Sequence, residues 1–127
     1  KYHRDYDALT GAPSFDKFYE EVTRLADWDN GHQHAMIVFD VEQLKIVNDL
    51  KGLRIGDLVL IHIADCLKEL VTAPNCYCRM YSDLFCIFMM YETKGDIIRF
   101  IEKLKKKIDR MIKKMILKLL HSFKFLL

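Results

Sequence analysis

Two separate stretches place carboxylates where they could bind a metal ion. Asp40 directly follows the apolar run Ala35–Phe39, and Asp83 lies between two further apolar runs, Cys76–Met80 and Leu84–Tyr91. Mg²⁺ prefers oxygen ligands and is often held by one or two carboxylates together with substrate phosphates. Two strand-end carboxylates brought together would suit such a site. The alternative is turn chemistry, because Asp is also a common residue of exposed turns.

The cysteines and histidines do not have the spacing of a metal motif. Only one residue separates Cys76 from Cys78, which is closer than in zinc knuckles, and no histidine pair lies at finger spacing. His32 and His34 fall in an expected loop. We therefore interpret the cysteines as small apolar residues that stay reduced in a cytosolic protein. The four are Cys66, Cys76, Cys78 and Cys86.

Length and composition indicate a single globular domain. The chain has 127 residues, of which 51% are hydrophobic and 30% charged. It has no uncharged apolar stretch of about 18 residues, so we expect no membrane span in this segment. Its first residues lack an apolar signal core, which favours a cytoplasmic location. Because the chain does not begin with Met, we interpret it as a fragment of a larger protein.

The C-terminal part is strongly basic. Residues 99–127 carry 10 Lys+Arg against 2 Asp+Glu. We interpret this as the solvated face of one amphipathic helix, rather than as a nucleic-acid or membrane surface. The opposite face carries an apolar seam that suits core packing, or a helix–helix contact in a homodimer. The seam residues are Ile97, Ile101, Leu104, Ile108, Met111 and Met115.

The hydrophobic pattern predicts mixed helices and strands. Helices are expected over 15–27 after the N-cap Ser14, over 42–50, from Gly56 onward and from Gly95 onward. Strands are expected over 35–39, 76–80, 84–91 and 121–127, with 35–39 a central strand buried on both faces. Asp57 would lie at the positive end of its helix, where capping explains a carboxylate without any ligand. This order predicts an α+β fold with helices packed on a sheet.

Three segments together resemble the GGDEF family, the diguanylate cyclase domain. Asp7-Ala8-Leu9-Thr10-Gly11 resembles its N-terminal D-x-L-T-G signature. Residues 39–49 with Gly56-Asp57 resemble its D-x-D-x-F-K-x-I-N-D…G-D block. Arg79–Phe85 lies where the family has R-Y-G-G-D/E-E-F. All three occur in the family's order and spacing.

The resemblance implies a ferredoxin-like, nucleotidyl-cyclase palm with a mostly antiparallel central sheet. Active members condense two GTP molecules into cyclic di-GMP with Mg²⁺. Transfer by residue type assigns Asp40, the Val41 carbonyl and Asp83 to the metal, Asn48 and Asp57 to guanine, and Lys45 to the phosphates. An amide with a carboxylate suits the donor and acceptor groups of guanine.

The signature turn departs from the family at the positions closest to the chemistry. Tyr81 and Ser82 replace the two glycines, and Leu84 replaces the glutamate that follows the metal carboxylate. Glycine is used where backbone approaches a ligand closely or takes a positive φ, and leucine neither binds metal nor moves a proton. Thr72 and Asn75 occupy the inhibitory R-x-x-D positions, so product feedback is expected to be absent. The family's C-terminal hairpin and last helix have no counterpart before Leu127.

Three functions remain open at this point. The first is a degenerate GGDEF domain without cyclase activity, which binds GTP–Mg²⁺ as a regulatory ligand. The second is a dimerisation or interaction module whose pocket is blocked by Tyr81. The third is an active diguanylate cyclase with a divergent turn. Each would be covalently linked to a sensor or effector domain in the whole protein.

Overall fold

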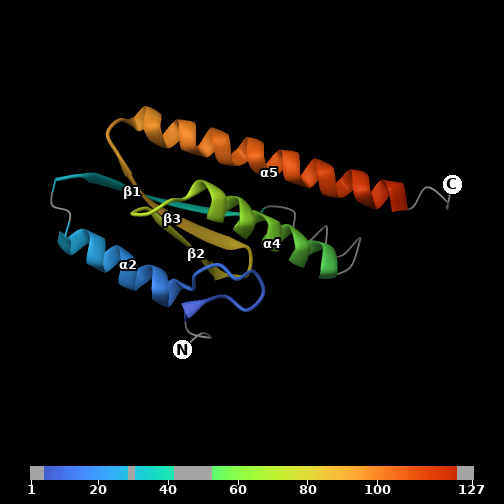
Figure 1. Ribbon diagram of the computed structural model, residues 1–127, viewed down its shortest axis with the longest axis horizontal. Helices are drawn as coiled ribbons and strands as arrows, with labels where there is room; N and C mark the ends of the chain where they lie inside the picture. The colour runs from blue at the N-terminus through green and yellow to red at the C-terminus, as the bar shows by residue number, and fades with distance from the viewer. Residues whose placement is uncertain (1–4, 29–30, 42–52, 123–127) are drawn as a thin grey trace.

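The computed structural model describes residues 5–28, 31–41 and 53–122 (Figure 1). The elements in chain order are α2 (Phe15–Trp28), β1 (Gln33–Asp40), α4 (Leu53–Leu70), β2 (Cys76–Tyr81), β3 (Leu84–Tyr91) and α5 (Lys94–Ser122). The expected helix over 42–50 lies outside the described residues. The two hairpin strands and the first helix are confirmed within one residue of their predicted bounds.

The sheet has three strands in the order β1-β3-β2, and both pairings are antiparallel. Because β3 lies between β1 and β2, the unit β1–α4–β2 is a split βαβ arrangement, as in ferredoxin-like folds. Helices α4 and α5 cover one face of the sheet, and α2 lies on the other (Figure 1). The predicted α+β fold with helices packed on an antiparallel sheet is confirmed.

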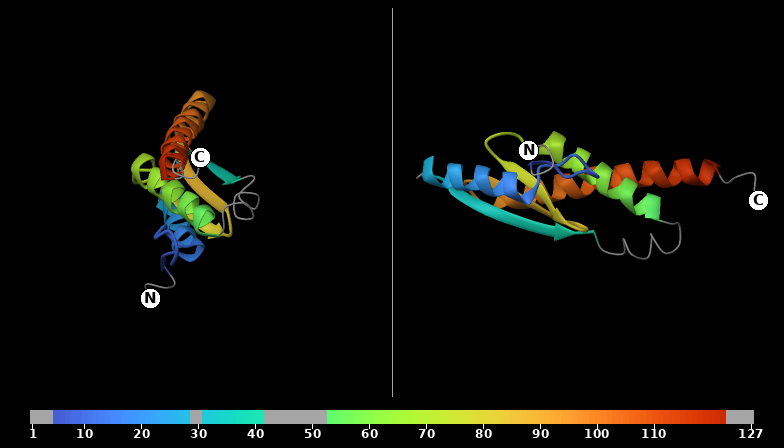
Figure 2. Two further views of the ribbon diagram at one scale, coloured as in Figure 1. Left: turned by 90° about the vertical axis from the view of Figure 1, so that its right-hand side faces the viewer. Right: turned by 90° about the horizontal axis from the view of Figure 1, so that it is seen from below.

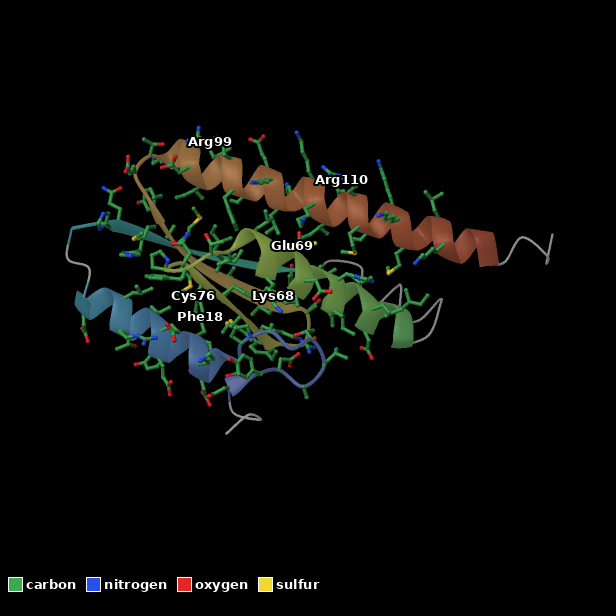
Figure 3. All side chains as sticks on the ribbon, viewed as in Figure 1. Phe18, Lys68, Glu69, Cys76, Arg99 and Arg110 are labelled. Atoms are coloured by element: carbon green, nitrogen blue, oxygen red, sulfur yellow. The ribbon has the colours of Figure 1, made fainter. Side chains whose placement is uncertain are left out.

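Each face of the sheet has its own apolar core. The larger core joins α4 to β3 and α5, and its fully buried side chains include Ile63, Leu67 and Phe85. The smaller core lies under α2, where Phe18 packs with cysteine side chains of β2 and β3 (Figure 3). The alternation of side chains along β3 therefore sends successive residues into two different cores.

Side chains at the helix starts explain two of the helix boundaries. Ser14 Oγ accepts a hydrogen bond from the Lys17 N–H at 3.2 Å, which confirms Ser14 as the N-cap of α2. In the first turn of α5, the Asp96 carboxylate accepts hydrogen bonds from the N–H groups of Glu92 and Thr93, which precede the helix, at 2.9 and 3.0 Å. Both contacts satisfy donors that a helix start leaves without an intrahelical partner.

The prediction that β1 is a central strand buried on both faces is not met within the described residues, where β1 pairs only with β3. Its outward residues Met36 and Val38 are 52% and 53% exposed, because α2 packs on β2 and leaves this part of the sheet face open. Ala35, Ile37 and Phe39 pack against the larger core. The strand is thus buried on one face only.

Two further predictions about helices require correction. Helix α4 begins at Leu53, so Asp57 lies in its second turn and capping does not explain it. Helix α5 continues through His121 and Ser122, where a strand was expected, and residues 123–127 lie outside the described residues. The lysine-rich face of α5 is exposed as predicted, with Arg99 and Arg110 among its side chains (Figure 3). None of the described helices is long and apolar enough to cross a membrane.

Candidate functional site

The candidate site lies where the β2–β3 turn meets the end of β1. Ser82 and Asp83 form the turn, and Asp40 is the register partner of Leu84. The Val41 N–H donates a hydrogen bond to the Asp83 carbonyl at 3.2 Å. The fold therefore brings Asp40, Val41 and Asp83 to one end of the sheet.

The oxygen donors and the exposure of these residues are chemically compatible with a hydrated magnesium ion. Asp40 is exposed and Asp83 is half-buried, so water and a phosphate can complete the coordination shell of a metal held there. The described residues contain no cluster of three or more His, Cys, Asp or Glu side chains suited to a metal. The ligands that the resemblance implies, two carboxylates and the Val41 carbonyl, are an all-oxygen set that would suit Mg²⁺ better than zinc.

A groove of about 750 Å³ adjoins the end of β1. Asp40 and Val41 line it from the strand, and Lys105, Ile108 and Asp109 line it from α5. One carboxylate of the candidate metal site therefore lines a hollow. The wall of the hollow is mixed, with apolar side chains, one lysine and the carboxylates of Asp40 and Asp109.

The hairpin turn is held by an ion pair with the N-terminal segment. Arg79 Nη1 donates to the Asp7 carboxylate at 2.9 Å, and its Nε donates to the Ser82 carbonyl at 2.8 Å. The same Asp7 oxygen accepts hydrogen bonds from the Thr10 N–H and hydroxyl, both at 2.8 Å. In the sequence, Asp7 served only to identify the D-x-L-T-G motif, and its contact with Arg79 was not predicted. The opposite charges of Asp7 and Arg79, in two of the segments that resemble the family, were the only hint of this contact.

The surroundings of Asp7 favour its ionised form. Partial burial opposes ionisation of the carboxylate, but the Thr10 hydrogen bonds and the Arg79 guanidinium outweigh it and lower the pKa of Asp7 below its usual value. The side chains of Arg79 and Asp7 are only 13% and 24% exposed. This pair is therefore shielded from solvent screening better than the exposed Arg99–Asp96 pair on α5.

The remaining predicted site residues have varied surroundings. Tyr81 projects from the end of β2 and is 67% exposed. Asp57 is exposed on α4, whereas Lys45 and Asn48 lie outside the described residues. At the opposite end of β2, Asn75 donates its N–H to the Thr72 carbonyl at 3.0 Å and accepts the Met90 N–H on its side chain at 2.9 Å. Asn75 therefore closes the β2–β3 ladder locally.

Ser82 has a backbone conformation that glycine adopts more easily than other residues. Its φ is +51°, in the left-handed region that costs a residue with a Cβ atom about 1–2 kcal/mol. We predict that Ser82→Gly raises the free energy of unfolding by about 1 kcal/mol, because glycine adopts this region without that penalty. Urea unfolding would measure the change. A loss of stability would show that the serine side chain contributes more than its backbone strain costs.

The cysteines behave as core residues. Cys78 and Cys86 are register partners on β2 and β3 and both are buried. Burial raises the pKa of Cys78 to about 12 and that of Cys76 to about 11, and it also raises the pKa of Cys66 and Cys86. The thiols therefore stay protonated near neutral pH, and the interpretation as reduced apolar residues agrees with this environment.

We predict that the native protein reacts slowly with a thiol reagent at pH 8. Only the thiolate is nucleophilic, and each raised pKa leaves little of it. Absorbance of the released thionitrobenzoate would follow the reaction with Ellman's reagent. Denatured protein, in which all four cysteines are accessible, is the control. Fast stoichiometric labelling of the native protein would contradict the assignment of these thiols to the core.

Comparison with known proteins identifies the family. The family model described as "Diguanylate cyclase, GGDEF domain" matches residues 4–122. The chain is 30% identical over 108 residues to the bifunctional diguanylate cyclase/cyclic di-GMP phosphodiesterase MucR of Pseudomonas aeruginosa, a match covering 83% of this chain and 16% of MucR. It is 27% identical over 104 residues to the diguanylate cyclase DgcP of Escherichia coli, covering 80% of this chain and 30% of DgcP. The chain thus spans a minor part of these curated relatives.

Solved structures agree with this assignment. The GGDEF domain of TpbB (YfiN) from Pseudomonas aeruginosa matches with a TM-score of 0.73 and 25% identity, over 80% of this chain and 61% of that one. The GGDEF domain of DgcB from Caulobacter crescentus, solved with c-di-GMP, matches with a TM-score of 0.72 and 22% identity, over 79% and 60%. Together with the family model, these matches show that the chain belongs to the diguanylate cyclase GGDEF domain family of cyclic di-GMP signalling.

Proposed function

We propose that this chain is a degenerate GGDEF domain that binds GTP with Mg²⁺ as a regulatory ligand and does not form cyclic di-GMP. The observation that carries the proposal is the end of the sheet. There Asp40, Val41 and Asp83 come together, while the register partner of Asp40 is Leu84. Oxygen ligands for a metal are present. The adjacent position lacks any group that could move a proton.

In this proposal the bound metal supplies neutralisation of phosphate charge. Asp40 and Asp83 would hold it, with the Val41 carbonyl as a third ligand. Asn48 and Asp57 would read guanine, and Lys45 would face the phosphates. Catalysis needs reacting groups to be positioned closely, and the substituted turn removes both the glycine backbone and the carboxylate. Such a turn would impair the formation of cyclic di-GMP more than it impairs weak binding of GTP.

The exposure of Tyr81 favours this proposal over a blocked pocket. A tyrosine that closed the site would be buried against it, whereas Tyr81 is 67% exposed. Thr72 and Asn75 carry no charge and hydrogen-bond within their own loop and ladder. We therefore propose that inhibitory product binding is absent. We also propose that nucleotide occupancy is passed to a covalently linked sensor or effector domain in a cytoplasmic signalling protein.

Two measurements test this proposal. Incubation with GTP and Mg²⁺, followed by chromatography, is expected to show no cyclic di-GMP; detection of the product would overturn the proposed inactivity. GTP with Mg²⁺ is expected to raise the melting temperature of the natural chain but not of Asp40→Asn or Asp83→Asn. Asp65→Asn, an exposed carboxylate on α4, is the matched control and should retain the shift.

A further inference from the structure

A cavity of about 590 Å³ lies between α2, the loop 71–75 and the start of β2. Figure 2 shows this loop beside α2. Small-molecule sites in proteins have volumes of roughly 300–1,000 Å³ and mostly apolar walls with a few polar groups. We infer that this cavity binds a medium-chain carboxylic acid, with the alkyl chain inside the cavity and the carboxylate at its rim.

The inner wall of the cavity is apolar. Phe18 and Leu25 line it from α2, and Phe18 is only 2% exposed. Val71 and Pro74 line it from the loop after α4. Cys76 of β2 packs with Phe18, as Figure 3 shows. Burial raises the pKa of the Cys76 thiol to about 11, so these surroundings disfavour a charged group. An alkyl chain suits them, because it leaves water without losing hydrogen bonds.

Two cations of α2 lie at the rim of the cavity. Lys17 and Arg24 both line it, and because they are about two helical turns apart, they share one face of α2. The Arg24 side chain is 67% exposed and Lys17 is half-buried, so neither charge is enclosed in the cavity. Glu21 lies between them and pairs with Arg24. The described lining residues thus carry two positive charges and one negative charge, and this excess of one positive charge is complementary to a single carboxylate.

Local hydrogen bonds hold the walls of the cavity in place. Ser14 caps α2 by accepting the Lys17 N–H on its hydroxyl oxygen. In the loop, Asn75 donates its N–H to the Thr72 carbonyl, and its side chain accepts the Met90 N–H from β3. The helix and the loop are therefore each fixed beside the cavity. A site that is formed in advance binds its ligand without the cost of first ordering a loop.

The cavity is separate from the candidate metal site. It lies at the Asn75 end of β2, whereas the turn that contains Asp83 follows the other end of this strand. The described residues that line the cavity include neither Asp40 nor Asp83. Binding of the acid should therefore be the same with and without GTP and Mg²⁺. A failure of this inference would leave the proposed nucleotide site unaffected, and the reverse also holds.

Calorimetric titration of the whole chain with octanoate, decanoate and decanol tests the inference. Decanoate is expected to bind at one site, about tenfold more tightly than octanoate, because two further methylene groups are buried. Decanol should bind more weakly than decanoate, because it has no charge to face Lys17 and Arg24. Absence of saturable decanoate binding would overturn the inference. So would equal affinities for decanoate and decanol, because the cations at the rim would then play no part.

Two variants test where the acid binds. Leu25→Trp fills the cavity and should abolish decanoate binding, whereas Leu58→Trp, at a position 44% exposed on α4, is the matched control and should retain it. Lys17→Glu should weaken decanoate binding by about fivefold or more and leave decanol binding unchanged. Lys103→Glu, at an exposed position on α5, is its control. Circular dichroism checks that each variant is folded. Decanoate binding that Leu25→Trp and Lys17→Glu both leave unchanged would overturn the inference, because the acid would then bind elsewhere.

Discussion

Replacing Phe85 with Ala is expected to lower the free energy of unfolding by about 3–5 kcal/mol. Phe85 follows Leu84 directly and is fully buried, at 0% exposure. Its ring stacks on Phe39 of β1, with ring centroids 5.5 Å apart. Truncation would leave a cavity between β1, β3 and α4, so the signature turn would lose its anchor in the core. Urea unfolding followed by circular dichroism measures the loss.

Two further substitutions make the Phe85 result interpretable. Phe85→Leu keeps most of the volume and should cost less than about 1.5 kcal/mol, so it stays measurable if the alanine variant does not fold. Tyr81→Ala, four residues earlier and largely exposed, should change stability little. Equal losses for Phe85→Ala and Tyr81→Ala would contradict the assignment of Phe85 to the core.

The second large effect is expected for Arg79→Ala, at about 2–3 kcal/mol near pH 7. The substitution removes the hydrogen bonds to Asp7 and to the Ser82 carbonyl and leaves a partly buried carboxylate without its cation. Arg99→Ala is the matched control, because the Arg99 side chain is 71% exposed in its pair with Asp96. The control should change stability little. Similar losses in both variants would contradict the special position of Arg79.

The loss of stability caused by Arg79→Ala should become smaller as the pH falls. The folded state lowers the pKa of Asp7, so the stabilisation is present above the unfolded-state value of about 3.9. It is lost as the pH falls through the folded-state pKa, because Asp7 then takes up a proton. The stability difference between the natural chain and Arg79→Ala should therefore shrink in acid. A difference that stays constant as the pH falls through the folded-state pKa of Asp7 would contradict a role for the Asp7 charge.

Sequence reasoning predicted best those parts that depend on local pattern. The helix after Ser14 and the hairpin of β2 and β3 follow from apolar spacing and turn residues. The sequence indicated that Asp40 and Asp83 lie at strand ends but left open whether they meet, and the structure brings both to one end of the sheet. A conformation with positive φ at Ser82 agrees with the glycine that the family uses there.

Properties that depend on distant packing could not be predicted. The continuous apolar run 35–39 predicts a strand buried on both faces. Whether the face that carries Met36 and Val38 is covered depends on where α2 packs on the sheet. The extension of α5 through Ser122 was missed because Phe123 and Phe125 alternate with Lys124 as in a strand. The Asp7–Arg79 pair joins residues 72 positions apart, and no local pattern reports such a contact.

The most direct test of the account is calorimetric titration of the chain with GTP, with and without Mg²⁺, and with ATP as the control nucleotide. The account predicts binding of GTP that requires Mg²⁺ and that ATP does not reproduce, because the carboxylates hold the metal and the guanine-reading residues select the base. Absence of heat at near-millimolar protein and nucleotide would contradict it. The fold would then serve this protein as a contact module without a nucleotide site.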